Sequence, residues 1–103
     1  MAVADVTDAN FESEVLQADK PVIVDFWAPW SVPCRRVSPI LDEMSESRED
    51  VRFVKVNVDD NPETAMSYSI TSIPTITRFE GGQIQKQAVG ALPKNQLAAQ
   101  LGL

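Results

Sequence analysis

Apolar residues along this chain occur in short runs typical of strands, separated by segments with the wider spacing typical of helices. The run from residue 22 to residue 27 is apolar at every position but one, which favours a central parallel strand over an edge strand. Four further β-rich runs predict strands at residues 3–6, 53–58, 75–79 and 83–89. The last two flank Gly81 and Gly82, which predicts a hairpin.

Four intervening segments have the capping residues and the spacing of helices. They are residues 7–18, 33–47, 62–68 and 93–101. Thr7 or Asp8 is the expected N-cap of the first helix, and Asn61 followed by Pro62 marks the start of the third. Pro39 lies inside the second helix and is expected to kink it. The order βαβαβαββα predicts an α/β fold, a central mixed sheet of about five strands with four helices on its two faces.

Size and composition limit what the chain does. Its 103 residues are expected to form one domain, residues 1–103. The net charge of −6 argues against non-specific nucleic-acid binding and against binding to an anionic membrane surface. No apolar run approaches the roughly 18 residues of a membrane span. The first five residues lack the basic and hydrophobic regions of a signal peptide, so we expect none.

The chain contains one cysteine and no histidine. A single cysteine excludes an internal disulfide and fits a reducing compartment. Without histidine, the usual base for a serine or cysteine nucleophile and the commonest metal ligand are missing. The cysteine ends the segment Trp30-Ser31-Val32-Pro33-Cys34, between the buried strand and a predicted helix. A cysteine at position 31 would make this a C-x-x-C redox motif, so the attacking sulfur is the missing part.

Three side chains near this motif have a chemical and a structural interpretation. Ser31 suits a helix N-cap, which we favour over a serine nucleophile because nothing obvious activates its hydroxyl. Cys34 is expected to be a small buried hydrophobe with a slow thiol, although it would form a mixed disulfide if exposed. Asp25 interrupts the apolar run, where burial would raise its pKa by desolvation. The alternative for Asp25 is a strand-end aspartate facing solvent, which its position makes less favourable.

The chain resembles the thioredoxin family over nearly its whole length. The matching segments occur in the right order, at residues 24–30, 33–35, 39–41, 55–59 with 61–62, 72–75 and 89–91. The family's motif is W-C-G-P-C, so two of its five positions differ here, at Ser31 and Val32. The resemblance implies a thioredoxin fold and a small cytosolic or plastid-type protein disulfide reductase, for which we expect a cytoplasmic location and no cofactor. It also implies disulfide-containing target proteins and a thioredoxin reductase as partners, and we expect a monomer.

The resemblance assigns roles to individual residues. Ser31 occupies the nucleophile position and Cys34 the resolving position. Asp25 would accept the proton of the resolving thiol, with Lys55 nearby. Pro74 matches the family's cis-proline, and cis is expected from the resemblance alone because most X–Pro bonds are trans. The implied substrate-binding residues are Trp30, Val32, Pro33, Ile73, Pro74, Gly90 and Ala91.

Two functions of different classes follow from this pattern. In the first, the chain is a thioredoxin disabled by serine at the nucleophilic position, most simply through engineering. In the second, it is a natural redox-dead thioredoxin-like module that binds proteins. Retention of Asp25, Lys55 and the Pro74 loop favours the first, because a redox-dead lineage has no evident need for a buried catalytic carboxylate. A weaker third alternative is a monothiol enzyme that uses Cys34 alone.

Overall fold

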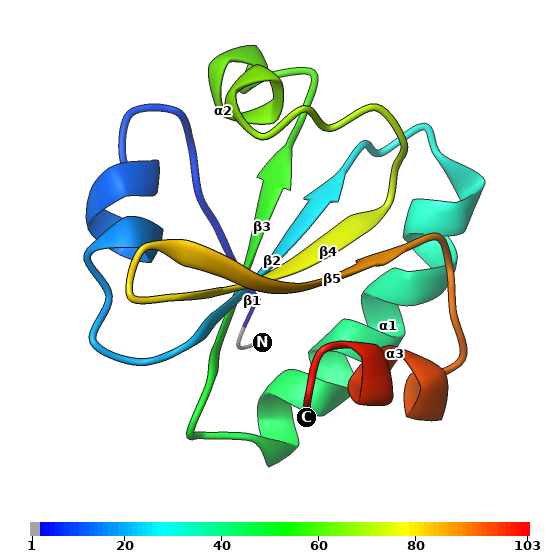
Figure 1. Ribbon diagram of the computed structural model, residues 1–103. Helices are drawn as coiled ribbons and strands as arrows, with labels where there is room; N and C mark the ends of the chain where they lie inside the picture. The colour runs from blue at the N-terminus through cyan, green and yellow to red at the C-terminus, as the bar shows by residue number, and fades with distance from the viewer. Residues whose placement is uncertain (1–2) are drawn as a thin grey trace.

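The computed structural model describes residues 3–103. The expectation about a signal peptide concerns residues 1–5, of which Met1 and Ala2 lie outside the described residues. Five strands form a sheet in the order β1-β3-β2-β4-β5 (Figure 1). They are β1 (Val3–Asp5), β2 (Val22–Trp27), β3 (Arg52–Asn57), β4 (Thr75–Glu80) and β5 (Gln83–Val89). Strand β2 is central, as predicted, but it is parallel only to β3 and is antiparallel to β4.

The helices are η1 (Glu12–Leu16), α1 (Val32–Ser47), α2 (Pro62–Ser67) and α3 (Lys94–Gln100). Figure 1 shows α1 and α3 on the same side of the sheet. Their buried residues form one core with one face of the sheet, which includes Ile23, Val37, Leu41, Ile76 and Leu97. The opposite face packs against η1 and the segment after α2, in a core that includes Phe11, Val15, Val24, Phe26 and Phe79. The predicted α/β fold, with five strands and four helices, is confirmed.

Alternation along β2 determines which face each of its side chains meets. Val24 belongs to the core beneath η1, whereas Ile23 belongs to the core beneath α1 and α3. Because successive side chains of a strand point to opposite faces, Asp25 lies on the same face as Ile23. The one charged residue of this buried strand therefore points toward the layer that contains α1.

The first helix differs from its prediction. It covers only Glu12–Leu16, is a π-helix, and has Phe11 as its N-cap in place of Thr7 or Asp8. The Asp8 carboxylate instead accepts hydrogen bonds from the backbone N–H and the hydroxyl of Thr64, at 2.8 and 2.6 Å. Asp8 thus caps α2 across more than fifty residues of sequence, and the hydroxyl of Thr64 lowers its pKa.

Other local predictions are confirmed with small shifts in their bounds. Asn61 is the N-cap of α2, although its side-chain oxygen accepts a hydrogen bond from Asp8 N, at 2.9 Å, and makes no cap bond. Gly81 and Gly82 form the hairpin turn with φ of +60° and +77°, which glycine adopts without steric strain. Helix α1 begins at Val32, one residue before its predicted start, and continues through Pro39.

Replacing Phe11 by alanine should lower the free energy of unfolding by about 3 to 5 kcal/mol, because it opens a cavity between η1 and the sheet. The ring is buried, with its centroid 5.5 Å from that of Tyr68 and 5.6 Å from that of Phe79. Chemical denaturation measures the loss. Leu16→Ala, at a half-buried position of the same helix, is the control and should cost less. An equal cost would mean that Phe11 does not anchor η1.

Candidate functional site

The predicted site residues converge at the carboxyl end of β2. In the register of the sheet, Trp27 pairs with Asn57 of β3, and Phe26 pairs with Thr75 of β4. Pro74 precedes Thr75, so it lies beside the end of β2, where the chain turns into α1. The peptide bond before Pro74 is cis. The N–H of Gly90 donates to the carbonyl of Pro74 at 2.9 Å, which brings a third segment to the same end of the sheet.

Ser31 is the N-cap of α1, which confirms its structural interpretation. Its hydroxyl oxygen accepts a hydrogen bond from the backbone N–H of Cys34, at 3.4 Å. Both side chains are shielded from solvent, with Ser31 5% exposed and Cys34 1% exposed. Among the described residues, no carboxylate or amine forms a hydrogen bond with the Ser31 hydroxyl. The structure therefore supplies Ser31 with a capping role and with no base to activate it.

Asp25 is buried, as its place in the apolar run predicts. It is only 4% exposed, and its Oδ1 has no hydrogen-bond partner among residues 3–103. Burial raises the pKa of this carboxyl to about 7, because desolvation penalises the charged form, while the positive charge of Lys55 acts in the opposite direction. A carboxyl with this pKa exchanges protons near neutral pH.

Lys55 is the direct neighbour of Asp25 on the parallel strand β3. Both residues lie on the face toward α1, because Phe53, two residues before Lys55, belongs to the same core as Ile23. The Lys55 ammonium lies 4.8 Å from the centroid of the Trp27 ring, in a cation–π contact. The predicted association of Asp25 with Lys55 is thus present in the register of the sheet.

The predicted substrate-binding residues differ in their exposure. Trp30 is 66% exposed and Val32 is 47% exposed, so two of the chain's exposed large apolar side chains lie here. Pro33 and Ala91 are also exposed, Ile73 and Gly90 are half-buried, and Pro74 is buried. Exposed apolar side chains therefore lie beside the shielded pair of Ser31 and Cys34.

Two further residues hold the loop that carries Trp30, and sequence reasoning missed both. The indole N–H of Trp30 donates to Asp59 Oδ2 at 2.7 Å. The Arg35 guanidinium donates to the carbonyl of Pro29 at 3.0 Å. The available signal was the place of Asp59, just after the carboxyl end of β3, where loops of neighbouring strands meet. Arg35 had no comparable signal, because its contact depends on how the loop turns.

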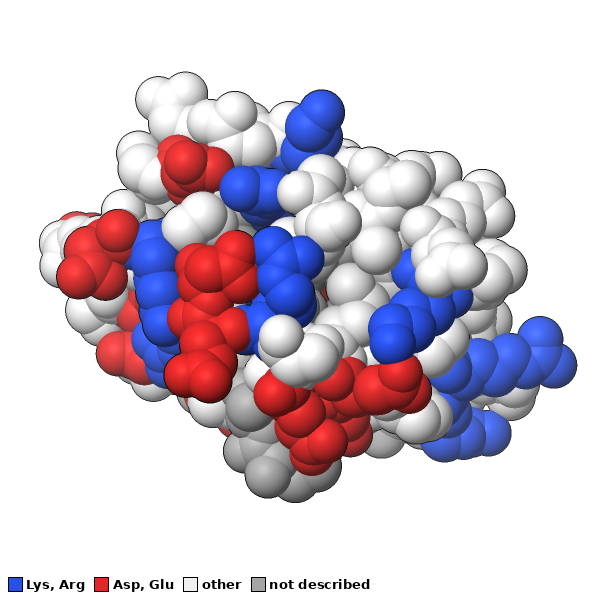
Figure 2. All heavy atoms as spheres, turned by 90° about the horizontal axis from the view of Figure 1, so that it is seen from below, with Lys and Arg blue, Asp and Glu red and all other residues white. Residues whose placement is uncertain are grey.

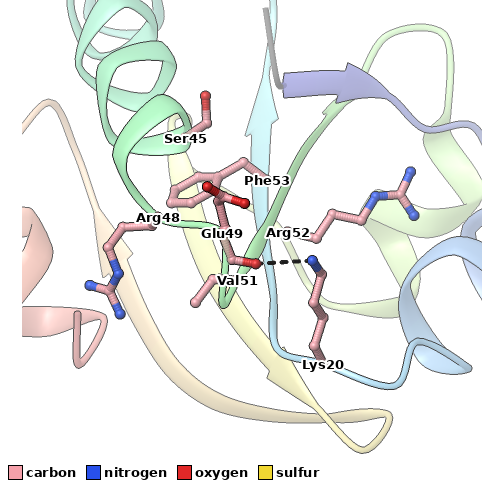
Figure 3. Close-up of a pocket in the computed structure, with 7 residues that line it drawn as sticks. All are labelled: Lys20, Ser45, Arg48, Glu49, Val51, Arg52 and Phe53. Atoms are coloured by element: carbon pink, nitrogen blue, oxygen red, sulfur yellow. Dashed lines mark hydrogen bonds between the residues drawn. The ribbon is translucent and has the colours of Figure 1, made fainter.

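A separate cavity of about 290 Å³ lies near the amino ends of β2 and β3 (Figure 3). It is lined by Lys20, Ser45, Arg48, Glu49, Val51, Arg52 and Phe53. Lys20 donates to the carbonyl of Glu49 at 3.1 Å, and the two arginine side chains extend in opposite directions in Figure 3. Arg48 pairs with Asp50 at 2.8 Å, and Arg52 pairs with Glu14 at 2.6 Å. Both arginines that line the cavity are thus already paired with carboxylates.

Residues 3–103 contain neither a metal-binding cluster nor a helix that could cross a membrane. In that part of the chain, no group of three or more His, Cys, Asp or Glu side chains is arranged to hold a metal ion. None of the helices described is long and apolar enough to cross a membrane.

Comparison with known proteins identifies the family. The thioredoxin family model matches residues 2–102. The chain is 52% identical over 101 residues to thioredoxin 1 of Nostoc sp., with 97% of this chain and 94% of the relative covered. It is 52% identical to the thioredoxin of Synechocystis sp. with the same coverage, and 47% identical over 97 residues to that of Haemophilus influenzae, with 93% and 91% covered. The chain belongs to the thioredoxin family.

Asp25→Ala should stabilise the fold, and more so at high pH. The folded-state pKa of about 7 lies above the unfolded value of about 3.9, so the folded state holds more protons between these values. The stability that protonated Asp25 contributes is complete below about pH 4 and is lost as pH rises through 7. The gain from Asp25→Ala should therefore grow by as much as about 4 kcal/mol between pH 4 and pH 8.

Chemical denaturation of both proteins across this pH range measures the difference. Asp25→Asn is the control for size, and it should show the same pH dependence because it too cannot ionise. A variant less stable than the parent at every pH would show that Asp25 is a satisfied partner, and its interpretation as a proton acceptor would then be wrong.

Proposed function

We propose that this chain is a thioredoxin-type protein disulfide reductase in which serine occupies the position of the nucleophilic cysteine. The observation that carries the proposal is the hydrogen bond from the Cys34 N–H to Ser31 Oγ at the first turn of α1. Unpaired N–H groups and the helix dipole favour a negative charge at this place. A sulfur here would be stabilised as a thiolate, whereas a hydroxyl without a base remains protonated.

With sulfur at position 31, the remaining residues support a complete exchange reaction. The thiolate attacks the target disulfide, forms a mixed disulfide and releases the first target thiolate. Cys34 then gives its proton to Asp25, and its sulfur attacks the mixed disulfide. This step forms an internal disulfide and releases the second target thiolate, so the target gains two electrons. A dithiol such as dithiothreitol, or a thioredoxin reductase, returns two electrons to the internal disulfide.

The buried Asp25 supports the proton-accepting role, because its pKa of about 7 suits a group that takes up a proton at neutral pH. The exposed Trp30 and Val32, with the Pro74 and Gly90 segments, would hold the target chain. We further propose a cytoplasmic monomer, since a dithiol reductase needs a reducing compartment to be recharged.

A protein-binding module without redox chemistry is the second candidate. The exposure of Trp30 and Val32 favours it as much as it favours a reductase, because either protein needs an apolar docking surface. The buried carboxylate of Asp25 favours the reductase over the binding module, because docking alone does not use it. A disabled reductase that still docks its targets would also act as a protein-binding module.

The chain as it stands should not accelerate the reduction of insulin by dithiothreitol. Ser31 cannot form the mixed disulfide, and the thiol of Cys34 is shielded from a protein substrate. Turbidity from the precipitating insulin chains measures the rate against dithiothreitol alone. Catalysis above that background, with Ser31 verified by mass spectrometry, would support the monothiol alternative and contradict the proposal.

Ser31→Cys should create reductase activity without any other change. We expect insulin reduction clearly above the rate with dithiothreitol alone, because an activated nucleophile is restored, and an oxidisable disulfide to Cys34. Ser31→Ala is the matched control and should stay inactive. A Ser31→Cys variant that forms the internal disulfide yet reduces no protein would favour the binding module.

A further inference from the structure

The first two turns of α1 carry two exposed arginines beside the site and no acidic residue. Arg35 and Arg36 follow Cys34 directly, and no acidic residue lies in the first turn. Cations at a helix N-terminus oppose the helix dipole and lower stability slightly. Residues that lower stability through unfavourable local electrostatics are expected mainly at functional sites.

These two charges are not neutralised by contacts within the described residues. The ion pairs among residues 3–103 involve Arg48, Arg52, Arg78 and Lys94. Arg35 donates only to the uncharged carbonyl of Pro29, and Arg36 has no hydrogen-bond partner in that part of the chain. Elsewhere the two signs are mixed, and Figure 2 shows basic side chains beside acidic ones on the face seen from below.

The two arginines lie next to the exposed apolar side chains of the site. Arg36 follows Val32 by four residues, so the two lie one above the other on one face of α1. Arg35 holds the carbonyl of Pro29, the residue before Trp30. We call Arg35 and Arg36, together with Trp30 and Val32, the basic flank.

The opposite side of Trp30 carries negatively charged side chains. Asp59 accepts the hydrogen bond of the indole, and Asp60 and Glu63 follow in the same loop and at the start of α2. Around Trp30, the unpaired arginines therefore lie on the α1 side and the carboxylates lie on the other side, in a chain whose net charge is −6. Within short range, such a patch attracts acidic groups even though the whole protein repels them.

We propose that the basic flank binds an extended protein segment that carries acidic residues beside its cysteine. The apolar part of the segment packs on Trp30 and Val32, and its carboxylates lie next to Arg35 and Arg36. This inference names the class of target for the site and rests on the proposed function, in that the same surface presents the target disulfide to position 31. Charge complementarity with the basic flank selects the target segment and determines its orientation on the surface.

The test uses the chain as it stands and two short peptides in which serine replaces the target cysteine. One peptide has aspartates on both sides of the serine, and the other has lysines at the same positions. Titration followed by NMR gives both affinities, and the indole N–H of Trp30 reports the place of binding. The acidic peptide should bind more tightly at low ionic strength, and the difference should largely vanish at about 1 M salt.

Arg36→Gln should weaken binding of the acidic peptide about threefold and leave the lysine peptide unchanged or slightly tighter. Lys20→Gln is the matched control, because it removes the same charge at the opposite end of the sheet and should change neither affinity. Equal affinities for the two peptides, no binding of either, or an acidic preference unaffected by Arg36→Gln would each overturn the inference.

A second measurement separates this inference from the proposed function. In the Ser31→Cys variant, kcat/KM is measured for the disulfide-linked dimers of two further peptides, which have the same acidic or basic sequences but keep the cysteine. A higher kcat/KM for the acidic peptide, lost on Arg36→Gln, would support the inference for the reaction as well as for binding. If the variant reduces neither peptide while the acidic one still binds through Arg36, the proposed function fails and the basic flank stands. If it reduces both equally, and both bind equally, the reductase stands and the basic flank fails.

Discussion

Strand β2 is hydrogen-bonded on both edges and covered on both faces, and the site depends on this complete burial. Its neighbours β3 and β4 run in opposite directions, so the carboxyl end of β2 meets the loop after β3 and the segment before β4. The same burial removes water from Asp25, the one charged residue in the strand, and raises its pKa to about 7. One constraint thus both gathers the segments of the site and brings the pKa of its buried carboxyl close to neutral pH.

Features that oppose stability gather at this end of the molecule. Asp25 is buried with one oxygen unpaired, Trp30 and Val32 expose apolar surface, and Arg35 and Arg36 lie near the positive end of a helix. At the other end of the sheet, Arg48 and Arg52 pair with carboxylates. Proteins tolerate such local costs mainly at functional sites, where a stable alternative would lose the function. The uneven distribution is therefore independent support for locating the site at the carboxyl end of β2.

The fold was largely predictable because its signals are local. An apolar run marks β2, two glycines mark the hairpin, and a serine before a helical segment marks the N-cap of α1. The sequence could not predict contacts between distant segments. Asp8 looks like the cap of the helix that follows it, yet it caps α2, because only the folded chain brings the two together. The bond between Trp30 and Asp59 has the same origin, since it joins two loops.

Position 31 separates the requirements of folding from those of chemistry. The cap of α1 needs an atom that accepts the Cys34 N–H, and a hydroxyl oxygen or a thiolate sulfur meets that need. Attack on a disulfide needs a thiolate, so serine there preserves the helix cap but cannot make that attack. Geometry at this residue is therefore compatible with a disabled reductase and with a binding module. Asp25 supports the proposed reductase, because burial of a carboxyl with an unpaired oxygen costs stability and docking alone does not use that carboxyl.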